Sequence, residues 1–394
     1  FLPALKASGI PVNICTEMPS DAFQPICETT ECLTDIVPLL PRHSRAGLEK
    51  LCVHLRNQRP DVFYVWQDGA VLTGILAALA AEVPRIVLSL RGLPPNLRPH
   101  LMKPEYYEMY QALATIPGVS FSCNSRRAAD AYADWLDLPK DTFSVIYNAV
   151  PRLDNTVSDA DQALWDRFVA ATPDATHTIG GVFRFNANKR PLLWVEAAQK
   201  ALTSQPGLRF VLVGDGEDMA ATRARATELG LADRILFVGQ SQYVGYWMTR
   251  FSALLHLAET EGLPNVLIEA QMAGVPVIAT PAGGSAETFT DGETGFLLSS
   301  AQTPALNQVT RALGTLFGPG GRHAEMSAKA QEYAGKSFNL ETILGQTMRF
   351  FHGQTLKGDK EDAARENVAP FPSLGSQVVF DPRVQDAYNV FAEK

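Results

Sequence analysis

One strand–helix–strand unit around residue 265 restricts the fold more than any other part of the chain. Apolar runs at 252–258 and 274–279 predict two buried strands, and Pro264 is suited to open the helix between them because its fixed φ matches the first helical position. Two strands joined by a helix are typical of a parallel sheet. Such sheets bind ligands just beyond the carboxyl ends of their strands. The stretch therefore predicts an α/β fold with a ligand site in the turn after the first strand.

Two glutamates flank that turn. Glu261 follows the first strand, and Glu269 lies little more than one turn into the helix. From Asn265 onward, the first backbone N–H groups of the helix lack intrahelical partners and lie at the positive end of its dipole. The combination predicts a cavity that attracts phosphates, carboxylates or ring hydroxyls. The alternative is a pair of solvated glutamates on an ordinary surface turn.

Composition narrows the class of protein. The 394 residues are enough for two domains, and 46% hydrophobic with 19% charged residues is ordinary for a globular α/β protein. A net charge of −8 argues against nucleic acid as a partner, because that would need a broad basic footprint. The five cysteines show no CxxC spacing, so we expect reduced thiols in the cytoplasm and no structural zinc or other metal. No run approaches the roughly 20 apolar residues of a membrane span, and no signal peptide is recognisable.

The alternation of strands and helices extends over most of the chain. In the first half, apolar runs predict strands at 10–15, 61–66, 85–90, 119–125 and 143–150. A polar segment at about 152–161 separates them from a second set of strands and helices. We therefore expect an amino-terminal domain at 1–151 and a second domain at 152–353, each built on a doubly wound parallel sheet.

The second domain opens with two glycines and two cations. Gly180 and Gly181 let the backbone approach a ligand closely, and Arg184 and Lys189 follow across a loop that leads into a helix. Arginine supplies a planar fork and lysine a compact charge, which together suit a diphosphate. A solvated basic loop is the alternative for these residues alone. Two later apolar strands end in a glycine at the expected ligand edge: Gly214 and Gly239.

Taken in order, these motifs resemble the GT-B glycosyltransferases of family four, with their Gly…Arg…Lys element and their Glu-x7-Glu signature around Gly-Leu-Pro-Asn. The resemblance covers most of the chain. It implies two Rossmann-like domains that face each other across a cleft, with the donor bound by the second domain and the acceptor by the first. The implied reaction is transfer of a hexosyl unit from a nucleotide diphosphate sugar, a UDP-sugar being the favoured donor, to an acceptor hydroxyl with retained configuration. Polysaccharide or glycoconjugate biosynthesis is the implied setting, and no cofactor is implied.

The resemblance also implies roles for individual residues. Arg184 and Lys189 would hold the donor diphosphate and assist departure of the leaving group, and Glu261 would bind the donor sugar; these three are the implied catalytic residues. Glu269 would bind the nucleotide ribose. The remaining donor-side residues are Gly180, Gly181, Gly214, Gly239, Gly262, Leu263, Pro264 and Asn265.

The chain departs from the family pattern in its first domain. Family members carry a histidine after a middle strand, where this chain has Arg91, which can bind a hydroxyl or phosphate but cannot act as a base. None of the other histidines considered offers a compelling replacement: His43, His54, His100 and His256. The strand and loop that normally open this domain are also missing before Phe1.

We expect the tail to supply the missing strand and loop. Residues 376–394 read as a strand, a loop and a helix that would complete the first domain, by circular permutation or by exchange with a neighbouring copy. Asp381 and Arg383 would then join Arg91 on the acceptor side. Residues 354–375 are predicted to be a linker or partly disordered, and a disordered extension is the alternative for the whole tail.

Other functions and partners stay open. Two facing Rossmann-like domains also describe non-catalytic sugar-binding proteins, although those need export, and GT-B isomerases or phosphorylases are a further class. The acceptor is expected to be a sugar or a lipid-linked sugar. Arginines at 42, 45, 56 and 59 fall on one arc of a predicted helix beside Leu48, Leu51 and Leu55, which suggests peripheral docking on an anionic membrane, with a solvated helix as the alternative.

Overall fold

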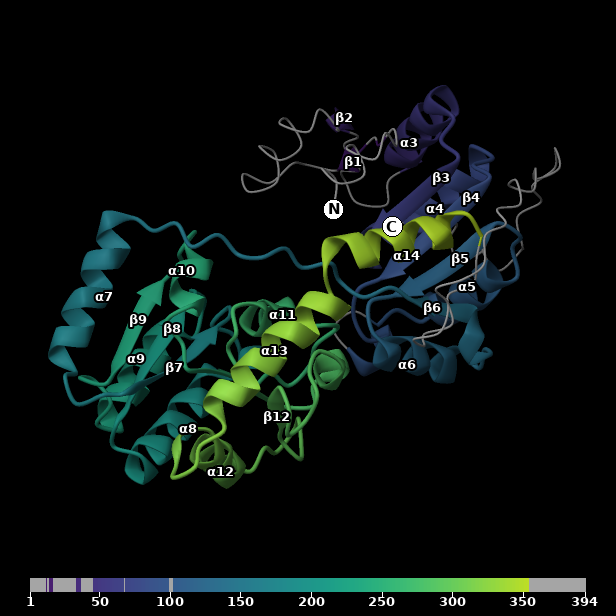
Figure 1. Cartoon of the computed structure of the whole chain (residues 1–394). Coiled ribbons are helices and arrows are strands. Elements are labelled where there is room, and N and C mark those ends of the chain that lie inside the picture. The colour runs from purple at the N-terminus through teal and green to yellow at the C-terminus, as the bar shows by residue number, and fades with distance from the viewer. Residues whose placement is uncertain are drawn as a thin grey trace. The chain divides into compact units, whose positions relative to one another are not determined.

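The computed structural model describes residues 12, 14–16, 33–36, 45–66, 68–98 and 102–353 (Figure 1). They divide into two compact units, the first drawn from residues 1–149 and 340–394 and the second from residues 150–339. The tail expected to complete the first domain, with Asp381 and Arg383, lies outside the described residues.

The first unit contains a four-stranded sheet in the order β3-β4-β5-β6, and every pairing in it is parallel. The strands are β3 (Val62–Trp66), β4 (Arg85–Leu90), β5 (Val119–Cys123) and β6 (Phe143–Val145). Most of β4 is buried, as expected for an apolar strand covered on both faces. Two short strands, β1 (Ile14–Thr16) and β2 (Leu33–Ile36), pair with each other in a separate sheet.

Helices pack on this sheet and form a core rich in aromatic rings. They are α3 (Arg45–Gln58), α4 (Asp68–Ala80), α5 (Glu105–Ala114), α6 (Arg126–Leu136) and α14 (Leu340–Phe351), with the 3₁₀ turns η1 (Pro95–Leu97) and η3 (Lys140–Thr142). Ser125 caps α6 by accepting a hydrogen bond of 3.1 Å from the Ala128 backbone N–H. Tyr110 packs on Phe121 and Tyr132 with ring centroids 6.3 and 6.0 Å apart.

The helix α14 corrects the predicted domain boundary. The sequence placed residues 340–353 at the end of the second domain, but α14 belongs to the first unit (Figure 1). Its buried residues Ile343 and Phe350 join one cluster with Val87 of the sheet, and Arg85 donates a hydrogen bond of 2.7 Å to the carbonyl of Phe350. An amphipathic pattern reveals that a helix has an apolar face, but it does not reveal which sheet that face covers.

The helix α3 bears two arginines of the suggested membrane surface, Arg45 and Arg56. Leu51 and Leu55 are buried in the core of the first unit, and Leu48 packs against the same core. Arg45 forms an ion pair with Glu49, and Arg56 donates to the carbonyl of Ala80. The apolar stripe of this helix therefore serves the fold. Docking of its arginines on a membrane stays a prediction, and Arg42 lies outside the described residues.

The second unit contains a six-stranded parallel sheet in the order β12-β11-β10-β7-β8-β9. The strands are β7 (His177–Val182), β8 (Leu208–Val213), β9 (Ile235–Gly239), β10 (Ala253–His256), β11 (Val277–Ala279) and β12 (Gly295–Leu297). The helices are α7 (Asp159–Ala171), α8 (Pro191–Ser204), α9 (Met219–Glu228), α10 (Val244–Met248), α11 (Asn265–Met272), α12 (Leu306–Phe317) and α13 (His323–Ser337), with η4 (Ala187–Lys189) and η5 (Gly283–Glu287). Within the part of the chain that the structure describes, no helix combines the length and the apolar character needed to cross a membrane.

Candidate active site

The order of the strands determines where the predicted site residues meet. From β7 the chain builds outward through β8 and β9, and then returns to place β10 on the other side of β7. The direction of winding thus reverses between β7 and β10. Parallel sheets bind ligands at the carboxyl ends of the two strands that flank such a reversal. The loop with Lys189 follows β7 and the turn with Glu261 follows β10, so both lie at this point.

Asn188 ties the two loops together. Its side-chain Nδ2 donates to the carbonyl of Thr260, and its Oδ1 accepts from the Thr260 backbone N–H, each at 2.9 Å. The backbone carbonyl of Asn188 accepts a third bond of 2.9 Å from the N–H of Glu259. Sequence reasoning missed this residue, because a single asparagine in a loop carries no pattern that indicates its partner.

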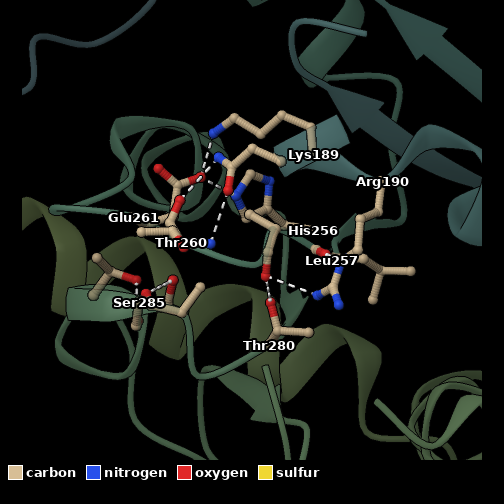
Figure 2. A network of polar contacts seen from close by, with 12 residues as sticks. Lys189, Arg190, His256, Leu257, Thr260, Glu261, Thr280 and Ser285 are labelled. Atoms are coloured by element: carbon tan, nitrogen blue, oxygen red, sulfur yellow. Dashed lines mark hydrogen bonds and ion pairs between the residues drawn. The ribbon is translucent and has the colours of Figure 1, made fainter. Parts of the chain in front are cut away.

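The network in Figure 2 centres on the carboxylate of Glu261. Lys189 Nζ contacts Glu261 Oε1, and His256 Nε2 lies 2.8 Å from the same oxygen. The His256 side chain is only 2% exposed and that of Glu261 12%. Burial opposes ionisation of Glu261, but the hydrogen bond and charge of His256 and the charge of Lys189 outweigh burial and hold the pKa of the carboxyl below its usual range. The site therefore stabilises an ionised Glu261.

Arg190 holds the backbone that leads from β10 into the turn with Glu261. Its guanidinium donates to the carbonyls of Leu257 and Ala258 at 2.7 and 2.9 Å and to that of Gln302 at 3.1 Å (Arg190 and Leu257 are labelled in Figure 2). Burial lowers the pKa of Arg190, and the nearby charge of Glu259 partly opposes this effect. Arg190 thus helps to satisfy the carbonyls just after β10, and the Thr280 hydroxyl also donates to that of Ala258. The residue next to the predicted Lys189 is thus structural.

The start of α11 differs slightly from the prediction. Pro264 takes the cap position with an extended backbone, and Asn265 is the first helical residue. Leu263 is buried. The backbone carbonyl of Gly262 accepts a hydrogen bond of 2.9 Å from the N–H of Gly284. Gly283 has φ 50°, and a Cβ there would lie 1.8 Å from the carbonyl oxygen of Glu261. The 282–284 turn therefore fixes the backbone of the site turn only because Gly283 has no side chain.

Glu269 differs from Glu261 in its surroundings. Among the residues that the structure describes, none forms a hydrogen bond or ion pair with its half-buried carboxylate. Burial raises the pKa of Glu269. A buried carboxylate without a donor is unfavourable in the free protein, and such groups are concentrated at binding sites.

The predicted glycines Gly180 and Gly181 lie against core side chains. A Cβ on Gly180 would lie 2.1 Å from the Phe251 ring, and one on Gly181 would lie 2.6 Å from Leu212 Cδ2. Both glycines therefore make room for core side chains. Gly214 has φ 130° and donates its N–H to the carbonyl of Gly239 at 2.8 Å, so these two glycines shape adjacent strand ends.

Two predicted cations, Arg184 and Arg91, have other partners. The side chain of Arg184 is 71% exposed, and its one ion pair among the described residues is with Glu217 at 3.6 Å. Arg91 belongs to the first unit, where it contacts Asn148 and the ring of Trp66. Within the described residues, no group of three or more His, Cys, Asp or Glu side chains is arranged to hold a metal ion.

Comparison with known proteins identifies the domain that carries this network. Residues 166–314 match the model of the family described as glycosyl transferases group 1. The matched range contains Lys189, His256, Glu261 and Glu269, so the second unit carries a group 1 glycosyltransferase domain. The match supports a group 1 glycosyltransferase domain, and membership of family four stays a prediction.

Named relatives extend over more of the chain. The Vi polysaccharide biosynthesis protein VipC/TviE of Salmonella typhi is 45% identical over 316 residues, which are 80% of this chain and 55% of that protein. The 2-deoxystreptamine glucosyltransferase of Streptomyces kanamyceticus is 26% identical over 341 residues, 81% of this chain and 84% of that protein. This chain thus spans about half the length of the Salmonella relative.

Solved structures share the fold. The crystal structure of Anabaena Alr3699/HepE in complex with UDP and glucose aligns with a TM-score of 0.73 and 19% identity, covering 90% of this chain and 95% of that one. WaaG, a glycosyltransferase involved in lipopolysaccharide biosynthesis, aligns with a TM-score of 0.61 and 16% identity, covering 89% of this chain and 94% of that one. The predicted fold class, two Rossmann-like domains of the GT-B type, is confirmed.

Proposed function

We propose that this protein is a retaining glycosyltransferase of family four that moves a hexosyl unit from a UDP-sugar to an acceptor hydroxyl in polysaccharide biosynthesis. One observation carries the proposal: Lys189 and Glu261 meet at the reversal of the second sheet, just before the helix α11 that bears Glu269, whose carboxylate has no partner among the described residues. Two comparisons support it, because one relative is named for polysaccharide biosynthesis and one similar fold holds UDP and glucose.

Glu269 is suited to the ribose of the nucleotide. A ribose presents two adjacent hydroxyl groups, and both can donate hydrogen bonds to one ionised carboxylate. These bonds would stabilise the charged form that burial disfavours in the free protein. Nucleotide binding therefore supplies the donors that Glu269 lacks.

Lys189 and Arg184 are suited to the diphosphate. Lys189 is held at the turn by Glu261, and Arg184 lies on the preceding loop in an exposed ion pair with Glu217. An exposed pair contributes only about 0–1 kcal/mol, so Arg184 can exchange Glu217 for a phosphate at little cost. Together the two cations would balance the charge of the leaving nucleotide without a required metal ion.

Glu261 and the first amides of α11 would hold the donor sugar. In the proposed step the bond between the anomeric carbon and the phosphate oxygen breaks, and the acceptor oxygen bonds to the same face of that carbon. The proton of the acceptor hydroxyl passes to the departing β-phosphate. Retention therefore needs no nucleophile from the protein, and Arg91, which cannot act as a base, is no obstacle.

A nucleotide-sugar screen tests this function. UDP-sugars and matched GDP- and ADP-sugars are added to the protein, and the shift in melting temperature is measured with and without EDTA. A donor at about one hundred times its dissociation constant adds about 2.7 kcal/mol of stability. We expect one UDP-sugar to stabilise the protein in EDTA, and the anomeric configuration of its product, determined by NMR, to match that of the donor. A protein that no nucleotide sugar stabilises, or an inverted product, would refute the proposal.

A further inference from the structure

A large aromatic side chain lies exposed at the carboxyl edge of the first sheet. Trp66 is the last residue of β3 and is 47% exposed, although tryptophan is usually well buried. It pairs in register with Ser89 on β4, and Arg91 follows two residues later. The carboxyl edge is where parallel sheets bind ligands. Trp66 and Arg91 therefore lie together at the ligand edge of a unit whose ligand is not assigned.

Several neighbours hold this pair in place. The Arg91 Cζ lies 4.8 Å from the centre of the Trp66 ring, and one of its terminal nitrogens donates to Asn148 Oδ1. Asn124 Nδ2 donates to the backbone carbonyl of Arg91 at 3.3 Å. The Tyr64 ring meets the Trp66 ring edge-on, with centroids 5.6 Å apart. Contacts from neighbouring strands thus order both side chains before any ligand binds.

The guanidinium of Arg91 lacks a countercharge. Among the residues that the structure describes, no carboxylate lies within ion-pair distance of it, whereas Arg225 and Arg234 each pair with one. Burial lowers the pKa of Arg91. One N–H group donates to Asn148, and a guanidinium has five. A largely buried cation without an anion is unfavourable unless a ligand brings the anion.

We propose that Trp66 and Arg91 form an acceptor subsite for an acidic sugar, whose ring packs on the exposed indole and whose carboxylate or phosphate pairs with the guanidinium. The inference rests on the proposed transferase function and specifies its acceptor class. Arginine matches both anions with two parallel hydrogen bonds, and the C–H face of a pyranose suits an aromatic ring. A neutral sugar leaves the guanidinium unpaired, so the subsite selects for charge.

Calorimetric titration of the intact protein with matched sugars tests the subsite. The probes are trisaccharides of glucuronic, galacturonic and mannuronic acid, the corresponding neutral trisaccharides, and the 6-phosphates of the parent hexoses. We expect at least one acidic sugar to bind tenfold or more tighter than its neutral counterpart, a preference that weakens with salt. Whether the uronates or the phosphates carry the preference identifies the anion. Equal binding of acidic and neutral sugars overturns the inference.

Variants assign the effect to the two residues. Arg91→Gln should remove the preference for acidic sugars, Trp66→Ala should weaken acidic and neutral sugars alike, and Trp66→Phe should retain most binding. The matched control is Arg209→Gln, because Arg209 stacks on Trp165 at the same 4.8 Å but lies on the second unit. Arg209→Gln should bind every sugar as the unaltered protein does. A preference that survives in Arg91→Gln contradicts the proposal.

Titration with UDP separates this inference from the proposed function. UDP should bind the Arg91→Gln and Trp66→Ala proteins with unchanged affinity, because the proposed donor residues lie on the second unit. If UDP does not bind the unaltered protein, the transferase proposal fails. If UDP binds but acidic and neutral sugars do not differ, only the acceptor inference fails. A loss of UDP affinity in Arg91→Gln as large as the loss for acidic sugars would make Arg91 a donor ligand and overturn the inference.

Discussion

His256 Nε2 and Glu261 Oε1 lie 2.8 Å apart, and the His256 ring is almost completely buried in the second unit. His256 is the last residue of β10, so the strand fixes its backbone and the core fixes its ring. Lys189 contacts the same carboxylate oxygen from the loop after β7. Glu261 is thus oriented by His256 from the core and by Lys189, the residue proposed to bind the donor diphosphate.

We predict that His256 acts as a positioning residue for Glu261. His256→Leu should lower kcat about 10- to 100-fold, with a smaller change in the KM for the donor, because Glu261 loses the bond that orients it toward the sugar. His256→Gln can place a side-chain N–H near the same oxygen and should recover much of the activity. The kinetic constants of both variants decide the question. Equal losses in the two variants, matched by equal losses of melting temperature, would indicate a role in packing alone.

Lys189→Ala should slow sugar transfer by about two to three orders of magnitude, as expected when one preorganised charge is removed from a developing anion. The variant should also bind UDP more weakly while binding uridine normally, since uridine has no phosphate. Titrations with both ligands measure this difference. Lys200→Ala, a change of an exposed lysine on α8, is the control and should behave as the unaltered protein. Full transfer activity in Lys189→Ala would remove the donor-site assignment.

The raised pKa of Glu269 predicts a pH-dependent affinity for UDP. The ribose hydroxyls bind the ionised carboxylate, so affinity should be weak below the raised pKa, increase as pH rises through it, and then level off. Titrations of UDP across this pH range should show that dependence, and Glu269→Gln should bind UDP weakly at every pH. An unaltered protein whose affinity for UDP does not change with pH would count against a ribose role.

Glu269→Gln should weaken UDP binding but increase the stability of the free protein. A carboxyl whose pKa is higher in the folded than in the unfolded protein binds extra protons when folded, so its ionisation destabilises the fold above that range. The glutamine variant should therefore melt at a higher temperature than the unaltered protein at neutral pH, and the difference should vanish below the unfolded pKa. Thermal unfolding at several pH values measures it. A variant that melts lower at neutral pH would mean that Glu269 has a stabilising partner.

Asn188→Ala should destabilise the second unit and weaken UDP binding together. The side chain makes two hydrogen bonds to Thr260, each contributing about 1 kcal/mol. A loss of about 2 kcal/mol lowers the melting temperature of a unit of this size by about 4–8 °C. Asn188→Asp keeps the acceptor but sets a carboxylate against the Thr260 carbonyl, so it should be no better than alanine. Calorimetric melts with and without UDP provide both readouts.

Sequence reasoning identified the charged site residues because their types and spacing follow a pattern. Lys189, Glu261 and Glu269 each stand in a motif with a chemical meaning, and two of them meet as expected. Asn188 was missed because its role depends on β7 and β10 being neighbours, and His256 was considered only as a replacement for the first domain's histidine. Strand order is a long-range property that local periodicity does not encode.

Other differences arise where a correct local feature has several physical uses. The glycines at 180 and 181 do permit close approach, and core side chains use the room they leave, whereas their predicted contact with a donor stays a prediction. The apolar stripe of α3 is real, yet it faces the protein core. In both cases the sequence predicted the local feature correctly but did not indicate which group contacts it.

The return of α14 to the first unit has a consequence for synthesis on the ribosome. Residues 150–339 form an insertion within the first unit, whose sheet is covered in part by residues translated after that insertion. Val87 and Ile146 therefore stay uncovered until Ile343 and Phe350 have been translated. By that time the whole second unit has emerged from the ribosome and can fold. If translation stopped just before residue 340, the sheet of the first unit would expose an apolar face to chaperones, whereas the second unit would be complete.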